Sequence, residues 1–101
     1  MALRIDDFEW LEVIVEKLVS KHGVEPEDAE SVIQNTDPPP YVRKTVNGKY
    51  VALGQVEGGG DYLAVVFAMP RPHSARIISA RPMDSAEKAE YRRRREGKQN
   101  R

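Results

Sequence analysis

The stretch YVRKTVNGKYVALGQV, residues 41–56, decides the fold class of this 101-residue chain. Two runs rich in β-branched and aromatic residues, 41–46 and 49–56, flank Asn47-Gly48. This dipeptide is the strongest short signal for a β-hairpin, because a tight two-residue turn favours positive φ at both central positions. A hairpin joins antiparallel strands, so these residues predict an antiparallel sheet.

Two further strands are expected downstream of this hairpin. The turn EGGGD (57–61) leads into YLAVVFAM (62–69), and the loop PRPHS leads into ARIISA (75–80). We interpret the EGGGD glycines as a turn, because a phosphate-binding loop would add a Lys-Ser/Thr pair and a following helix. The centre of the chain therefore predicts a sheet of about four antiparallel strands.

Two helices are expected before the sheet. Residues 9–21 place apolar side chains at i, i+3, i+4 and i+7 from Leu11 to Leu18, which is the stripe of an amphipathic helix packed on a core. Gly23 ends this helix. A second helix is expected over PEDAESVIQ (26–34), where a proline suits the first turn and acidic residues favour the positive end of the helix dipole.

A third helix is expected at the C-terminal end. After Arg81-Pro82, Asp84 is placed to cap the helix, and Glu87 stands three residues on, as in the acidic partner of a capping box. The predicted fold is α+β, with two N-terminal helices, an antiparallel sheet and a C-terminal helix. We expect one domain over residues 1–96 and a disordered tail over 97–101.

Composition narrows the class of protein. Hydrophobic residues make up 40% and charged residues 32%, which is typical of a globular domain. There is no cysteine, so disulfides and thiolate metal sites are excluded, and His22 and His73 are too far apart in sequence to suggest zinc. We expect no metal or other cofactor. The apolar runs fall short of the roughly 20 residues of a membrane span, so we expect a cytoplasmic protein without membrane contact.

Charge is distributed unevenly along the chain. Residues 1–70 carry 6 Lys/Arg and 12 Asp/Glu, whereas residues 71–101 carry 10 Lys/Arg and 4 Asp/Glu, so the two parts have net charges of −6 and +6. The run Arg92–Arg95 is the densest basic segment. This separation favours a polyanion-binding end. An equally weighted alternative is that the arginines are the solvated end of a helix, where cations complement the dipole.

The residues that could carry chemistry suit RNA cleavage. That reaction needs a group to deprotonate the 2′-OH, cations to stabilise the charged phosphorus intermediate, and a donor for the leaving oxygen. The candidate catalytic residues are His73, Arg76, Arg81, Glu87 and Tyr91. The candidate RNA-binding residues are Arg43, Lys49, Arg92, Arg93, Arg94 and Arg95.

These candidates also have purely structural interpretations. Glu87 could serve only as a helix cap or as the i, i+4 partner of Tyr91, and Tyr91 could pack its ring on the sheet. Arg43 and Lys44 are neighbours on a strand, so they cannot both face one groove. Arg76 and Arg81 are five residues apart and would point to opposite faces of an unbroken strand. Pro82 predicts a break at Arg81 that would let them converge.

The quoted residues also resemble a known family. FEW (8–10), KHGV (21–24) followed by EDAE, and RIISAR (76–81) with Glu87 and Tyr91 downstream occur in the order seen in the BrnT family. BrnT proteins are toxins of bacterial type II toxin–antitoxin systems, small RelE-like ribonucleases. The chain differs from the family pattern in its apolar helix after Trp10 and in lacking a basic residue near the end of the second strand.

The resemblance implies a function and a partner. It implies mRNA cleavage that inhibits translation, and a cognate antitoxin that binds the toxin and represses the operon, so that DNA is reached only through the antitoxin. Arg76 and Arg81 would handle phosphates, and Glu87 and Tyr91 would lie on the bordering helix. Lys21-His22 match a family pair of unassigned role. The alternative hypothesis is a degenerate, non-catalytic toxin that only binds the antitoxin or nucleic acid.

Overall fold

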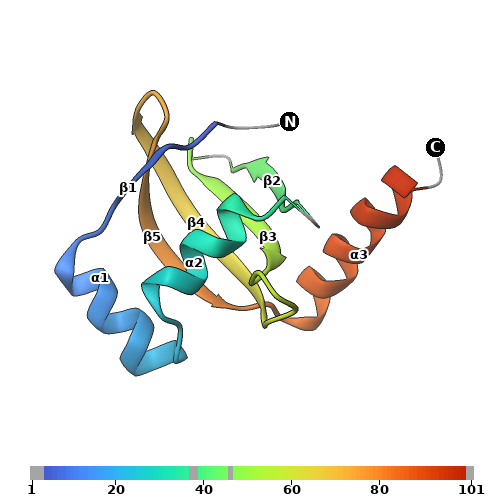
Figure 1. The fold of residues 1–101 in the computed structure, drawn as a ribbon, viewed down its shortest axis with the longest axis horizontal. Helices are drawn as coiled ribbons and strands as arrows, with labels where there is room; N and C mark the ends of the chain where they lie inside the picture. The colour runs from blue at the N-terminus through green and yellow to red at the C-terminus, as the bar shows by residue number, and fades with distance from the viewer. Residues whose placement is uncertain (1–3, 37–38, 46, 100–101) are drawn as a thin grey trace.

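The protein is a five-stranded sheet with helices on both faces (Figure 1). The computed structural model describes residues 4–36, 39–45 and 47–99. In chain order the elements are β1 (Asp7–Glu9), α1 (Glu12–Lys17), the π-helical turn η1 (Leu18–His22), α2 (Pro26–Gln34), β2 (Tyr41–Lys44), β3 (Tyr50–Gln55), β4 (Tyr62–Arg71), β5 (Ser74–Pro82) and α3 (Ser85–Gln99).

The sheet confirms the α+β class but corrects its topology. The strand order is β1-β5-β4-β3-β2, in which β2 to β5 are the four predicted antiparallel strands and β1 is an additional strand parallel to β5. β1 has only three residues and pairs Glu9 with Arg76, far along the chain. Such a short strand lacks a detectable alternation, and its pairing depends on distant residues, so the local pattern did not predict it.

The helices follow the predicted order with changes in their bounds. α2 coincides with the predicted range 26–34. The first helix does not run over 9–21 as predicted, because the chain begins as β1, forms α1 and then widens into η1. Gly23 ends η1 with a φ of 63°, a left-handed conformation that suits glycine. α3 continues through Gln99, and residues 100–101 of the predicted tail lie outside the described residues.

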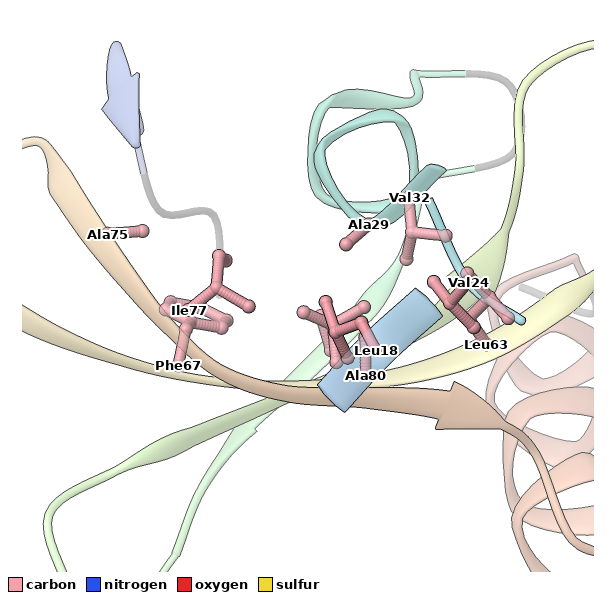
Figure 2. Packing of buried hydrophobic residues seen from close by; sticks show 11 residues of the cluster. Leu18, Val24, Ala29, Val32, Leu63, Phe67, Ala75, Ile77 and Ala80 are labelled. Carbon is pink, nitrogen blue, oxygen red and sulfur yellow. The ribbon is translucent and has the colours of Figure 1, made fainter. Parts of the chain in front are cut away.

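The main core lies between the sheet and the N-terminal helices. Figure 2 shows Leu18 of η1 beside Ala80 of β5, and Val32 of α2 pointing towards the sheet. Leu18 and Val32 belong to one cluster with Phe67 and Ile77 of the sheet, and all four side chains are fully buried. At Gly54 of β3, a Cβ would lie 3.0 Å from Val32 Cγ1. The glycine therefore allows α2 to approach the sheet closely.

The opposite sheet face carries a smaller apolar cluster, and we call it the α3 face. It consists of Val51, Leu53, Ala64, Met83 and Tyr91. Within residues 85–95 of α3, only Tyr91 is buried. The helix is therefore attached through one aromatic side chain and polar contacts, which leaves much of its length projecting from the domain in Figure 1.

Candidate functional site

A β-bulge in β5 places the two predicted phosphate-binding arginines on one face. Arg76 pairs with Ala68 of β4, and Arg81 pairs with Ala64. The register shifts at Ile78, which has no partner between the Phe67–Ile77 and Val66–Ser79 pairs. One extra residue restores the common direction of two side chains five positions apart.

The predicted break at Arg81 is wrong, because β5 continues through Pro82. The bulge places Arg76 and Arg81 on the same face instead, but the two side chains do not converge, because they lie five residues apart and bind different carboxylates. Ser79, between them, faces the same way through its pairing with Val66. The sequence carries no bulge signal here, since neither Ile77 nor Ile78 is a residue type that marks such a distortion.

Arg81 and Glu87 form a bidentate ion pair, which we call the Arg81–Glu87 clamp. Arg81 Nη1 and Nη2 donate to Glu87 Oε1 and Oε2, each at 2.7 Å. The hydrogen bonds from Arg81 hold the pKa of Glu87 below its ordinary value, although partial burial opposes this shift. In the same way, the bonds to Glu87 raise the pKa of Arg81. Both groups are therefore charged at neutral pH.

Glu87 also forms the predicted capping box. The Glu87 N–H donates to Asp84 Oδ1 at 2.8 Å, and the Asp84 N–H donates to Glu87 Oε1 at 3.0 Å. The side chain of Glu87 is only 14% exposed. One carboxylate thus fixes both the start of α3 and the orientation of Arg81.

A second ion pair attaches α3 at the far side of the sheet. Arg43 of β2 pairs with Val51, so it faces α3, and its Nε donates to Glu90 Oε2 at 3.2 Å. Its neighbour Lys44 pairs with Tyr50, so it lies on the other face, as predicted. α3 is therefore tied to β5 by Glu87 and to β2 by Glu90.

Tyr91 anchors α3 between these two ion pairs. It is 3% exposed, and its ring lies edge-on to Tyr62 with centroids 5.9 Å apart. Burial raises the pKa of Tyr91, and the charge of Arg95, whose guanidinium lies 5.6 Å from the ring centre, opposes the increase. In this arrangement the Tyr91 side chain packs on the sheet, as in the structural interpretation.

The basic run on α3 divides into two pairs. Arg94 lies 4.9 Å from the centre of the Tyr41 ring, and Arg95 lies over Tyr91, so both make cation–π contacts. Arg92 and Arg93 are exposed. Part of the run therefore holds the helix on the sheet, and part remains directed towards solvent.

A second group of charges lies at the other end of β5, and we call it the Glu9 cluster. Glu9 Oε1 accepts from Arg76 Nε at 3.2 Å and Nη2 at 3.1 Å, and Arg71 Nη2 lies 2.7 Å from Glu9 Oε2. Arg76 is a predicted site residue, whereas Glu9 and Arg71 are not among the predicted ones. Their meeting depends on the parallel pairing of β1 with β5, which has no local signal.

The remaining candidates lie away from the clamp. His73 is in the β4–β5 turn with a φ of 65°, eight residues from Arg81 or roughly 26 Å along an extended strand. Lys49 is exposed in the β2–β3 hairpin, whose end pairs with Phe67 rather than with the Arg81 region. Lys21 and His22 belong to η1, which packs on the opposite sheet face. The structure therefore does not bring these four residues to Arg81.

Comparison with known proteins identifies the family. A model of the family described as ribonuclease toxin, BrnT, of type II toxin–antitoxin systems matches residues 10–87. The chain belongs to the BrnT family. The crystal structure of the Brucella abortus ribonuclease toxin BrnT is similar, with a TM-score of 0.63 and 22% identity over 78% of this chain and 97% of that chain. At 22% sequence identity, this similarity shows that the two proteins share a fold. None of the curated proteins compared matches the chain.

The BrnT match covers most of the site but not all of it. Arg71, Arg76, Arg81 and Glu87 lie inside residues 10–87, whereas Glu9 and the rest of α3 lie outside. Across the described segments, no three His, Cys, Asp or Glu side chains cluster in a way that could hold a metal ion. Within the same segments, no helix has the length and apolar character to cross a membrane.

Proposed function

We propose that this BrnT-family protein is a cytoplasmic endoribonuclease toxin that cleaves mRNA, stops translation and is neutralised by a cognate antitoxin. The observation that carries the proposal is the placement of Arg76 and Arg81 on the α3 face by the bulge at Ile78, where their side chains are 45% and 41% exposed. Two guanidinium groups on one surface suit separate, non-adjacent phosphates of one RNA strand. The family match supports ribonuclease chemistry for that surface.

The proposed reaction is cleavage by the 2′-OH of RNA. Loss of its proton lets the 2′ oxygen attack the adjacent phosphorus, the bond to the 5′ oxygen breaks, and a proton must reach that leaving oxygen. The arginines stabilise the negative charge that develops on the phosphoryl oxygens. His73 lies three residues before Arg76, in the turn that leads into β5, and is the proposed acid–base group at the Arg76 end of β5.

Glu87 has a different proposed role. A general base works best when its pKa lies near the operating pH, and the pKa of Glu87 is lowered by its bonds from Arg81. A carboxylate of this kind is a weak base. We therefore assign Glu87 the role of a positioning residue that holds Arg81.

One observation favours a second candidate function, a non-catalytic binding module. Both terminal nitrogens of Arg81 donate to Glu87, so the pair is neutral and attracts RNA phosphates less strongly than an unpaired guanidinium while α3 stays in place. A protein that kept this arrangement would bind an antitoxin or nucleic acid without turnover.

Inducible expression in a bacterial host separates the two functions. We expect the wild type to arrest growth and degrade bulk mRNA, and the double variant Arg76→Ala/Arg81→Ala to do neither at equal soluble abundance. Lys88→Ala removes one positive charge from the exposed side of α3 and should behave as the wild type.

The chemistry is tested with purified protein and a labelled RNA oligonucleotide in EDTA. A single 2′-deoxy substitution at the cleavage position should block the cut, because the attacking oxygen is missing. If the folded wild type binds the unmodified RNA with a steep salt dependence and never cleaves it, the binding module replaces the ribonuclease.

A further inference from the structure

We infer that the Glu9 cluster is the site of the scissile phosphate, in which Arg71 and Arg76 bind the phosphodiester and Glu9 is a positioning residue. This inference rests on the proposed ribonuclease function and deepens it. It adds two residues, Glu9 and Arg71, to the site and places the reacting group at the β1 end of β5.

The first argument is charge. One carboxylate serves two guanidinium groups, so the cluster retains a net positive charge. Each guanidinium has five N–H donors. Arg76 directs Nε and Nη2 to Glu9, and Arg71 directs Nη2, which leaves donors on both side chains for phosphate oxygens. Phosphates are bound well by guanidinium groups held in such a fixed orientation.

The second argument is exposure. The side chains of Arg71 and Arg76 are 63% and 45% exposed, whereas that of Glu9 is 24% exposed. The carboxylate is thus the less accessible member of the cluster, and the two cations are the parts that a ligand from solvent would meet first.

The third argument is the rigidity of the support. Glu9 lies on β1, where the parallel register sets it directly beside Arg76. The carbonyl of His73 accepts from the Asp6 N–H at 2.8 Å and the Asp7 N–H at 3.2 Å, so the β4–β5 turn holds the start of β1. A site carried by paired strands keeps its side chains in a narrow range of positions.

A purely structural role would be to attach β1 to the β4–β5 hairpin. Exposed ion pairs contribute little to stability, and two arginines on one carboxylate leave one charge uncompensated, which attachment alone does not require. The cluster also shares the α3 face with Arg81 and adjoins His73 in the chain. These features favour phosphate binding.

The test uses the purified full-length chain and a labelled single-stranded RNA oligonucleotide. Three variants are compared with the wild type: Glu9→Gln, Arg71→Ala and the control Arg4→Ala. Arg4 is exposed near β1 and pairs with Asp6 at 3.2 Å, so its loss removes the same charge from the same end of the molecule. KM, kcat, the melting temperature and the salt dependence of RNA affinity are measured for each.

Glu9→Gln should lower kcat about tenfold or more, because Arg76 loses its orientation. Its KM should not rise, since the loss of a negative charge favours RNA binding. Arg71→Ala should weaken RNA binding and reduce the slope of log affinity against log salt by about 0.7, the value for one phosphate contact on a single strand. Arg4→Ala should keep the wild-type kcat and slope.

An unchanged kcat in Glu9→Gln with a lower melting temperature would reduce the cluster to a structural attachment. If Glu9→Gln does not fold, the test rests on Arg71→Ala. The inference is overturned if the slope of log RNA affinity against log salt is the same for Arg71→Ala as for Arg4→Ala. If the wild type binds RNA without cleaving it, the proposed function fails, and the slope still decides whether the cluster contacts phosphate.

Discussion

The two ends of β5 carry the same residue types in different proportions. At one end Glu9 is shared by Arg71 and Arg76, and at the other Glu87 is matched by Arg81 alone. The first carboxylate is on an edge strand in the sheet, and the second is on a helix that touches the sheet through few side chains. One end keeps a net positive charge and is carried by paired strands, and the other is a neutral pair carried partly by a helix that is held by Tyr91 and polar contacts.

This difference shows that an arginine on a strand is not by itself an available phosphate ligand. The ratio of carboxylates to guanidinium groups decides how much positive charge is left to attract a phosphate, and the element that carries the carboxylate decides whether that carboxylate can move away. Arg76 shares Glu9 with Arg71, so positive charge is left there for the proposed phosphate. Arg81 also keeps N–H donors, but its charge is balanced by Glu87 alone, so it attracts a phosphate less strongly while Glu87 stays in place. Roughly 16 Å of extended strand separate the two arginines.

The largest expected effect contrasts Arg76→Ala with Arg81→Ala in RNA cleavage by the purified protein. Removing a group that stabilises transition-state charge costs about 10²–10³ in kcat, and we expect this loss for Arg76→Ala. Arg81→Ala should mainly raise KM, because Arg81 contacts a phosphate outside the reacting bond. Steady-state kinetics at several RNA concentrations measures both. The reverse pattern, with kcat lost at Arg81, would move the scissile phosphate to the α3 end.

A smaller effect concerns the stability of the Arg81–Glu87 clamp. The pKa of Glu87 is lowered in the folded protein, so its stabilising contribution is complete above the ordinary value of 4.5 and is lost as pH falls through the lower folded pKa. Glu87→Gln keeps a capping-box side chain but removes the charge. At neutral pH this variant should lose about 1 kcal/mol of unfolding free energy, because Arg81 is partly exposed.

The measurement is urea unfolding of both proteins from pH 7 down to pH 3. The difference in unfolding free energy between the wild type and Glu87→Gln should shrink below pH 4.5, the ordinary pKa of the glutamate side chain. Glu16→Gln, at an exposed position of α1, should show no comparable difference at either pH. A difference that stayed constant with pH would mean that the clamp contributes nothing to stability.

The smallest expected effect is that of Tyr91→Phe. The Tyr91 side chain is buried under α3 and meets no ligand in this arrangement, so kcat should stay within about twofold of wild type, as for the loss of a weak hydrogen bond. Because burial raises the pKa of Tyr91, wild-type stability should fall as pH rises above 10, and the Phe variant should not share that loss. A large loss of kcat would instead show that α3 moves and that Tyr91 acts on RNA.

Local patterns predicted the parts of the fold that depend on neighbouring residues. The helix over 26–34 begins at a proline and has the expected bounds, and the Asp84–Glu87 capping box forms as spaced. The Asn47-Gly48 hairpin joins β2 and β3 as predicted, with a φ of 78° at Gly48, but Asn47 does not have the positive φ that was expected at both central positions. In each case the residues that predict the element are within a few positions of the residues that form it.

The unpredicted parts depend on distant partners. Glu9 meets Arg76 only because β1 pairs in parallel with a strand far along the chain, and its letters FEW carry no such information. The bulge at Ile78 is set by the register against β4, which a single strand cannot reveal. The sequence therefore allowed candidate residues such as Arg76 to be named. The partners that orient these side chains could be identified only from the pairing of the strands.

The short length of β1 has a consequence for solubility. β1 pairs only with Ser74–Arg76, so the described part of β5 beyond that point is an edge of the sheet. An uncovered edge can recruit a strand from another copy of the chain, and charged side chains hinder such pairing. Arg76 and Arg81 lie near the two ends of this edge, where their charges are expected to hinder such pairing. Lysine replacements would keep that protection while removing the fork-shaped donor geometry.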